Sequence, residues 1–178
     1  MAKRVSFSGE NLSLAEAALH HNDTAGALTL FFSAASPLYP GRFVGYKLDE
    51  VRDELGDRLA ELDRNTTMSL LSAVEAAFRI DYLQRCYQKK KDDVSRQFWD
   101  IYKEKDTRAS LEDDIFEVWK NATSGSSKLI AELRGAFKFR HWLAHGRYWT
   151  PKLGQRYYYL SVYPLVLQAL SSLPLMAA

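Results

Sequence analysis

The sequence predicts an all-α protein, an up-and-down helical bundle with an N-terminal helical extension. Apolar residues recur at intervals of three and four through most of the chain, and no alternating pattern of strand length competes with them. Short breaks rich in Gly, Pro and Ser separate the helical segments. The 178 residues, 47% hydrophobic and 26% charged, suffice for a domain with a buried core. We expect a helical extension over residues 1–45 and a bundle domain over residues 46–178.

The first part of the chain is expected to hold three helices. Residues 12–20 and 23–35 are apolar segments, and Asn11 is placed to cap the first of them. Two prolines and a glycine break the chain at residues 36–41. Leucines and a valine at intervals of three and four then mark an amphipathic helix over residues 48–62.

The rest of the chain is expected to hold helices over residues 67–88, 94–101, 111–119 and 128–144 and from residue 161 onward. Ser110 and Asp113 resemble a capping box in front of the helix over 111–119, and Gly146 is expected to end the helix over 128–144. The last 22 residues, 157–178, are uncharged, which is close to the roughly 20 residues of a membrane span. Prolines and polar residues interrupt this stretch, so we expect a core or interface helix and no membrane attachment.

Several classes of protein are excluded by what the chain lacks. Cys86 is the only cysteine, so an intramolecular disulfide cannot form. The first residues are too polar for the core of a signal peptide. Neither a nucleophile elbow nor a Gly-rich phosphate loop is present. We therefore expect a cytoplasmic protein that uses no cofactor.

Positive charge is concentrated in one segment of the chain. Residues 128–156 hold seven Lys or Arg and one acidic residue, a charge of +6, whereas the rest of the chain carries −4. Five aromatic residues are interleaved with these cations. Such a segment suggests a surface that faces a polyanion. The alternative is a solvated helix face whose acidic partners lie elsewhere in the fold.

One basic residue lies where helical periodicity calls for an apolar one. Arg140 falls in the middle of the apolar stripe of residues 128–144, and Glu75 falls in the stripe of residues 67–88. A charge in such a position must be paired or must face a cleft, because desolvating it alone is costly. We therefore expect an ion pair between them, either as a structural salt bridge or as a means of orienting Arg140 for catalysis.

His145 follows Arg140 by five residues. A continuous helix would point the two side chains about 140° apart. They converge if the helix ends near His145, as Gly146 permits, or if a second subunit supplies the partner. An imidazole beside a guanidinium suits metal-free cleavage of a phosphodiester. The imidazole transfers protons near neutral pH, and the guanidinium neutralises the charge that develops on the phosphate.

A metal site is the alternative explanation of the histidines. His141 and His145 have the i, i+4 spacing of a metal-binding pair on a helix. However, Trp142 stands where a metalloprotease has its glutamate, and no third ligand lies nearby in the sequence. We expect no metal.

Residues 137–146, FKFRHWLAHG, resemble the R-x4-6-H motif of the HEPN family (higher eukaryote and prokaryote nucleotide-binding domains). Residues 71–79, LSAVEAAFR, resemble the preceding core helix of that family with its polar residue. The resemblance covers roughly residues 48–173. It implies a homodimeric, metal-independent endoribonuclease that acts as a toxin or phage-defence effector, with an antitoxin or another defence-system protein as a partner.

The resemblance also implies roles for individual residues. Arg140 would bind the scissile phosphate, His145 would be the general acid and base, and Glu75 would orient Arg140. Further contacts to RNA are expected from Lys138, His141, Arg147 and Tyr148. The alternative is a catalytically silent HEPN-like module for RNA binding or protein assembly, in which Arg140 only pairs with Glu75.

Overall fold

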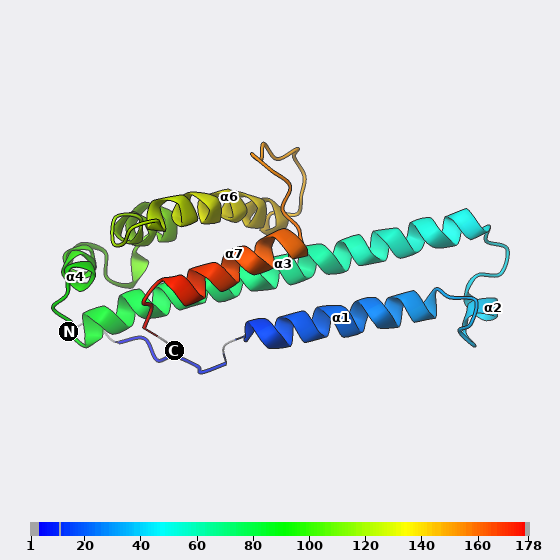
Figure 1. The fold of residues 1–178 in the computed structure, drawn as a ribbon, viewed down its shortest axis with the longest axis horizontal. Helices are drawn as coiled ribbons and strands as arrows, with labels where there is room; N and C mark the ends of the chain where they lie inside the picture. Colours follow the sequence, from blue (N-terminus) through cyan, green and yellow to red (C-terminus); the bar gives the residue numbers. More distant parts are fainter. Residues whose placement is uncertain (1–3, 11, 177–178) are drawn as a thin grey trace.

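The structure is a computed structural model that describes residues 4–10 and 12–176, and within these residues it contains helices and no strand (Figure 1). The predicted all-α class is confirmed. The elements in chain order are α1 (Leu14–Phe31), α2 (Tyr39–Arg42), α3 (Leu48–Tyr87), α4 (Asp93–Lys105), the 3-10 turn η1 (Asp106–Arg108), the π turn η2 (Leu111–Ile115), α5 (Phe116–Lys120), α6 (Ser126–Ala144) and α7 (Tyr159–Ser172).

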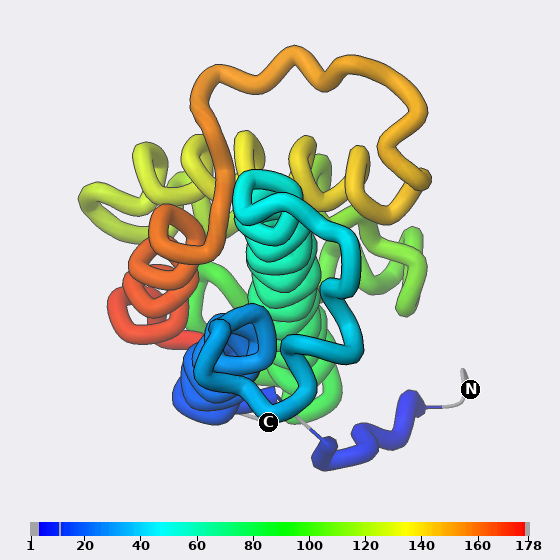
Figure 2. The backbone as a smooth tube through the Cα atoms, turned by 90° about the vertical axis from the view of Figure 1, so that its right-hand side faces the viewer, coloured from blue at the N-terminus to red at the C-terminus, as the bar shows by residue number. Residues whose placement is uncertain are grey.

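Helix α3, 40 residues long, is the axis of the molecule, and α1, α4, α6 and α7 all contact it (Figures 1 and 2). The expected helices over 48–62 and 67–88 are one continuous helix, so that prediction was wrong at the junction. The polar residues there do not break the helix, because the Thr66 hydroxyl donates to the carbonyl of Leu62 at 3.0 Å and the Ser69 hydroxyl donates to that of Asn65 at 3.0 Å.

Helix α1 is likewise a single helix, where two apolar segments over 12–20 and 23–35 were expected. Its N-terminus is closed by a capping box. The Ser13 hydroxyl accepts from the backbone N–H of Glu16, and the Glu16 carboxylate accepts from the backbone N–H of Ser13. The expected cap, Asn11, lies outside the described residues. The expected break at 36–41 holds the short helix α2.

The core has two parts of unequal size. The central core lies where α3, α5, α6 and α7 meet, and Phe78, Trp119, Leu133 and Val162 are fully buried in it. A smaller distal core joins the last turn of α1 to α2 and the first turns of α3, at the end of the molecule where α1 leads into α2 (Figure 1). The distal core is formed by Phe32, Phe43 and Val51.

The N-terminal extension packs against the bundle. Ala17 of α1 belongs to the central core, and the ring of His21 stacks on Tyr159 of α7 at 4.0 Å between centroids. Nδ1 of His21 also lies 3.0 Å from the hydroxyl of Thr66 on α3. None of the described helices is long and apolar enough to cross a membrane. The uncharged α7 buries one face in the central core instead.

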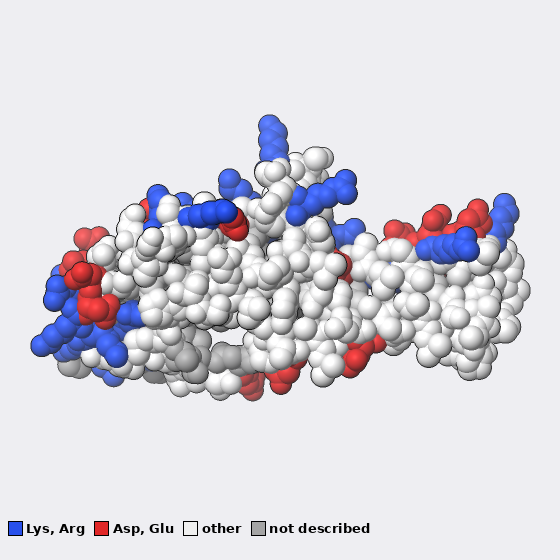
Figure 3. All heavy atoms as spheres, viewed as in Figure 1, with Lys and Arg blue, Asp and Glu red and all other residues white. Residues whose placement is uncertain are grey.

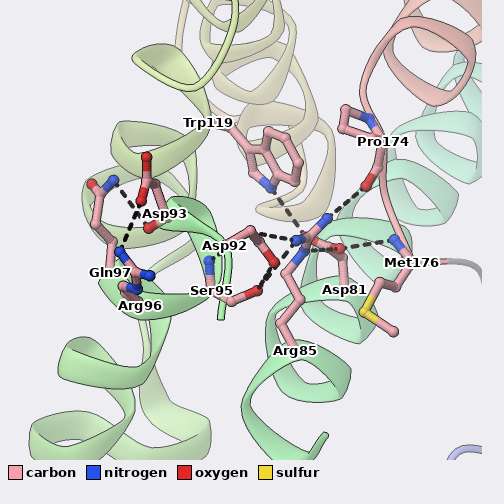
Figure 4. A network of polar contacts seen from close by, with 10 residues as sticks. All are labelled: Asp81, Arg85, Asp92, Asp93, Ser95, Arg96, Gln97, Trp119, Pro174 and Met176. Atoms are coloured by element: carbon pink, nitrogen blue, oxygen red, sulfur yellow. Dashed lines mark hydrogen bonds and ion pairs between the residues drawn. The ribbon is translucent and has the colours of Figure 1, made fainter. Parts of the chain in front are cut away.

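A buried polar network fastens the C-terminal end of α3 to its neighbours (Figure 4). Asp81, completely buried, accepts hydrogen bonds from Nε of Arg85 at 2.6 Å, from the indole N–H of Trp119 at 3.2 Å and from the backbone N–H of Met176 at 2.8 Å. The Arg85 guanidinium also donates to Asp92, Ser95 and the carbonyl of Pro174. Burial raises the pKa of Asp81 despite these donors. The network sets the position of α4 relative to α3.

Candidate active site

The expected pair between Arg140 and Glu75 is present. Nη2 of Arg140 on α6 lies 2.9 Å from Oε2 of Glu75 on α3. The other carboxylate oxygen accepts from Nε of Arg79, one turn along α3, at 2.8 Å. Arg79 in turn donates to the carbonyl of Ala109 at 3.1 Å, which holds the segment before η2 against α3. Glu75 therefore bridges two arginines, and one of them is also fixed by a backbone carbonyl.

Arg140 is not enclosed by this pairing. Its side chain is 29% exposed and faces a cleft of about 390 Å³ between α3, α6 and η2. The guanidinium lies over the ring of Phe137 at 5.9 Å, and the buried Nε finds no hydrogen-bond partner among the described residues. The cleft is lined by Glu75, Ser110, Leu111, Glu112, Asp113, Phe137, Arg140 and His141. A guanidinium so placed is held in one position and still open to a ligand.

The two histidines form a pair at the end of α6. The ring centroids of His141 and His145 are 4.2 Å apart, and both side chains are exposed. The backbone N–H of His145 donates to the carbonyl of His141, after which Gly146 takes a φ of 76° and ends the helix. His141 lines the Arg140 cleft, whereas His145 does not. The helix thus ends at His145 as expected, but within this chain His145 contacts His141 and is not brought into the Arg140 cleft.

A second cleft adjoins the first. It encloses about 440 Å³, and Glu112 and His141 line both clefts. Lys138 and Lys152 line the second cleft from α6 and from the loop after it, and Trp149 forms another part of its wall. The expected RNA contacts Lys138 and His141 thus lie on one continuous surface with Arg140.

The other two expected RNA contacts lie apart from the clefts. Nη1 of Arg147 is 2.6 Å from Oε2 of Glu61 on α3, so this arginine fastens the loop after α6 to the axial helix. The hydrogen bond from Arg147 holds the pKa of Glu61 below its ordinary value. Tyr148 is 83% exposed and packs edge-on against Trp149. The indole N–H of Trp142 donates to the carbonyl of Trp149 at 2.6 Å, which fixes the loop at a second point.

Sequence reasoning missed several residues of the site. Arg79 lies four residues after Glu75, a spacing that indicates an ion pair on a helix and would have revealed it. The acidic wall formed by Glu112 and Asp113 had no such signal, because it belongs to η2, which is distant in the sequence. These carboxylates repel an anion on the η2 side of the cleft, whereas Arg140 and Lys138 on α6 attract it.

A metal-binding cluster is absent from the described part of the chain, where no group of three or more His, Cys, Asp or Glu side chains is suitably placed. His21 is occupied by its contacts with Thr66 and Tyr159. Cys86 is buried at the C-terminal end of α3, and burial raises the pKa of its thiol to about 12. The pair of His141 and His145 thus finds no third ligand among these side chains.

Taken together, the end of α6 offers a fixed guanidinium, two imidazoles and a lysine beside open clefts. This is the set of groups needed to bind a phosphate and to move a proton near neutral pH. Comparison with known proteins does not assign the chain to a family: no family model, no curated protein and no solved structure matches it.

Proposed function

We propose that this protein is a metal-independent endoribonuclease of the HEPN type, with its active site at the C-terminal end of α6. The observation that carries the proposal is the state of Arg140. Glu75 orients its guanidinium, yet the side chain keeps 29% of its surface exposed in a cleft that also presents His141. A purely structural salt bridge has no need of an open cleft beside a histidine pair.

The proposed reaction is an internal transesterification. The ribose 2′-oxygen attacks the adjacent phosphorus, and the bond from phosphorus to the 5′-oxygen of the next nucleotide breaks. His145 accepts the proton of the 2′-hydroxyl and, as the general acid, returns a proton to the leaving 5′-oxygen. The products are a 2′,3′-cyclic phosphate and a 5′-hydroxyl. Arg140 stabilises the charge that develops on the two non-bridging oxygens.

The remaining residues act around this centre. Glu75 is a positioning residue, since it pairs with Arg140 and as an acidic group would act on the phosphate only through that arginine. His141 packs against the His145 ring and restricts its orientation. Lys138 contributes charge to the second cleft, where the adjoining phosphate of the RNA is expected.

The active unit is proposed to be a homodimer with the α6 ends near the two-fold axis. His145 is exposed at the end of α6, and Tyr148 in the loop after it and Leu160 in the first turn of α7 are also largely exposed. A symmetric contact at this end would cover them and would bring two sets of Arg140 and His145 together. In a cell, we expect such an enzyme to act as a toxin or phage-defence effector, restrained or triggered by an antitoxin or another defence-system protein.

Incubation of the purified protein with single-stranded RNA in the presence of a chelator tests the proposal. We expect fragments that end in a 2′,3′-cyclic phosphate. Cleavage that is lost in chelator and restored by zinc would instead support a metal site at His141 and His145. RNA that is bound and left intact would support the catalytically silent module.

A further inference from the structure

A third cleft, separate from the two beside α6, lies at the opposite end of the molecule from the distal core, where α3 leads into α4. It encloses about 590 Å³, and five of its eight lining residues are cationic whereas one is acidic. Figure 3 shows Lys and Arg side chains gathered at this end of the molecule. Its exposed lining residues are Lys89, Lys90, Lys91, Arg96, Trp99 and Asp100.

Part of the positive charge of this cleft is uncompensated. Asp100 is paired with Lys103 at 2.6 Å, and Arg96 is paired with Asp93 at 3.2 Å. The three lysines are exposed and have no ion-pair partner in the described part of the chain. Three adjacent ammonium groups without counter-charges repel one another and attract an anion.

The turn that carries the lysines is built in a way that favours a glycine. The N–H of Lys90 donates to the carbonyl of Arg85 and the N–H of Lys89 donates to that of Cys86, the two hydrogen bonds of a Schellman motif. Lys89 occupies the left-handed position with a φ of 49°. A lysine in this position is less stable than a glycine, so the charge is present at the expense of local stability.

The cleft also contains a flat aromatic wall. Trp99 is 38% exposed, and its indole stacks on Tyr102 with an interplanar angle of 18° and 5.7 Å between centroids. The stacking holds one face of the indole against the protein and leaves the ring as a rigid part of the cleft. Arg85, which also lines the cleft, is held in place by hydrogen bonds to Asp81, Asp92, Ser95 and the carbonyl of Pro174 (Figure 4).

We propose that this cleft binds single-stranded nucleic acid, with one base stacked on Trp99 and the flanking phosphates on Lys89, Lys90 and Lys91. An aromatic ring beside cations is the arrangement by which proteins hold unpaired nucleotides, since every base has a face that stacks and every linkage carries a charge. An acidic peptide would use the lysines alone, and a lipid surface requires a convex patch whereas this site is concave. The proposal does not depend on the cleavage reaction at Arg140.

Fluorescence anisotropy with a labelled 2′-O-methyl oligouridine tests the proposal, because this probe has no free 2′-hydroxyl and is not consumed by the proposed nuclease. The double variant Lys90→Gln/Lys91→Gln should weaken binding roughly tenfold at low salt. It should also reduce the slope of log K against log salt by about 1.4, corresponding to two phosphate contacts. Trp99→Leu should weaken binding about tenfold with the salt slope unchanged.

Two further variants separate binding from folding. Lys89→Gly should weaken binding while raising the thermal unfolding midpoint, a combination that a damaged fold cannot produce. Lys47→Gln removes an exposed lysine that precedes α3, at the opposite end of the molecule from the cleft, and should change binding less than twofold. The proposal is overturned if the wild-type protein does not bind the probe, if the cleft variants bind it as the wild type does, or if vesicles containing phosphatidylserine are bound and the probe is not.

Discussion

Arg140 carries a charge at a position where helix periodicity calls for an apolar side chain, and Glu75 does the same on another helix. The sequence was enough to predict their pairing, because two isolated opposite charges in apolar stripes stabilise each other. The four-residue spacing of Glu75 and Arg79 also indicates their pair, although the apolar stripes alone did not reveal it. The sequence was not enough to predict that η2 leaves a cleft beside Arg140, because this depends on how segments distant in the sequence pack.

The double pairing of Glu75 makes Arg140 suitable for substitution. Arg140→Ala should lower the free energy of unfolding by no more than about 1 kcal/mol, because Arg79 continues to neutralise Glu75. Urea denaturation of the variant and the wild type measures the difference. A loss on the order of 3–5 kcal/mol, as for a stranded buried charge, would show that Arg79 does not compensate.

At the scale of whole elements, helical periodicity located the helices better than it located their ends. The expected capping residue Ser110 does accept from the backbone N–H of Asp113 at 3.2 Å. The first turn after it is nevertheless a π turn, in which Ile115 donates to Ser110. The helices over 48–62 and 67–88 are joined because hydroxyl groups bond within the helix at Thr66 and Ser69. A sequence does not reveal whether such a side chain ends a helix or bonds inside it.

The buried network at the end of α3 should dominate the stability of its junction with α4. Asp81→Ala removes the carboxylate that accepts from Nε of Arg85, so this buried guanidinium loses one of its acceptors. The indole N–H of Trp119 also loses its acceptor. We expect a loss of about 3–5 kcal/mol in the free energy of unfolding, measured by urea denaturation. Asp100→Ala, which breaks an exposed pair with Lys103, is the matched control and should cost less than about 1 kcal/mol. Equal losses in the two variants would contradict the role given to the network.

The loop after α6 should loosen in acid. The pKa of Glu61 is lowered by Arg147 in the folded protein, so the pair stabilises the docked loop at neutral pH. This contribution is lost as the pH falls through the lowered pKa and Glu61 becomes protonated. Hydrogen-exchange protection of residues 146–158 should therefore fall a few-fold on acidification and should already be low at neutral pH in Glu61→Gln. A loop equally protected in the variant and the wild type would show that Trp142 alone holds it.

At the scale of the whole molecule, the two ends of α3 differ in character. One end carries the small distal core and the other carries the polar network and the basic cleft, while the proposed active site lies between them on α6. The all-α class followed from periodicity because nearly every segment obeys it. The continuity of α1 and of α3 could not be predicted from the sequence, because a long continuous helix and two shorter helices show the same apolar pattern.

A dimer joined at the α6 ends should show concentration-dependent activity. Specific activity is expected to fall on dilution through the dissociation range, because each site then loses the partner set of Arg140 and His145. Analytical ultracentrifugation over the same concentrations gives the oligomeric state. A monomer in sedimentation that keeps constant specific activity would rule out the dimer.

The central claim, that Arg140 and His145 cleave RNA, is tested most directly by single-turnover cleavage of one RNA in chelator by four proteins. These are the wild type, Arg140→Ala, His145→Ala and His141→Ala, each first shown to be folded. Loss of Arg140 or His145 should lower the rate about 10²- to 10⁴-fold, because each acts on the reacting atoms, whereas loss of His141 should have a milder effect. Undiminished cleavage by His145→Ala, or a greater loss in His141→Ala than in His145→Ala, would contradict the assignment.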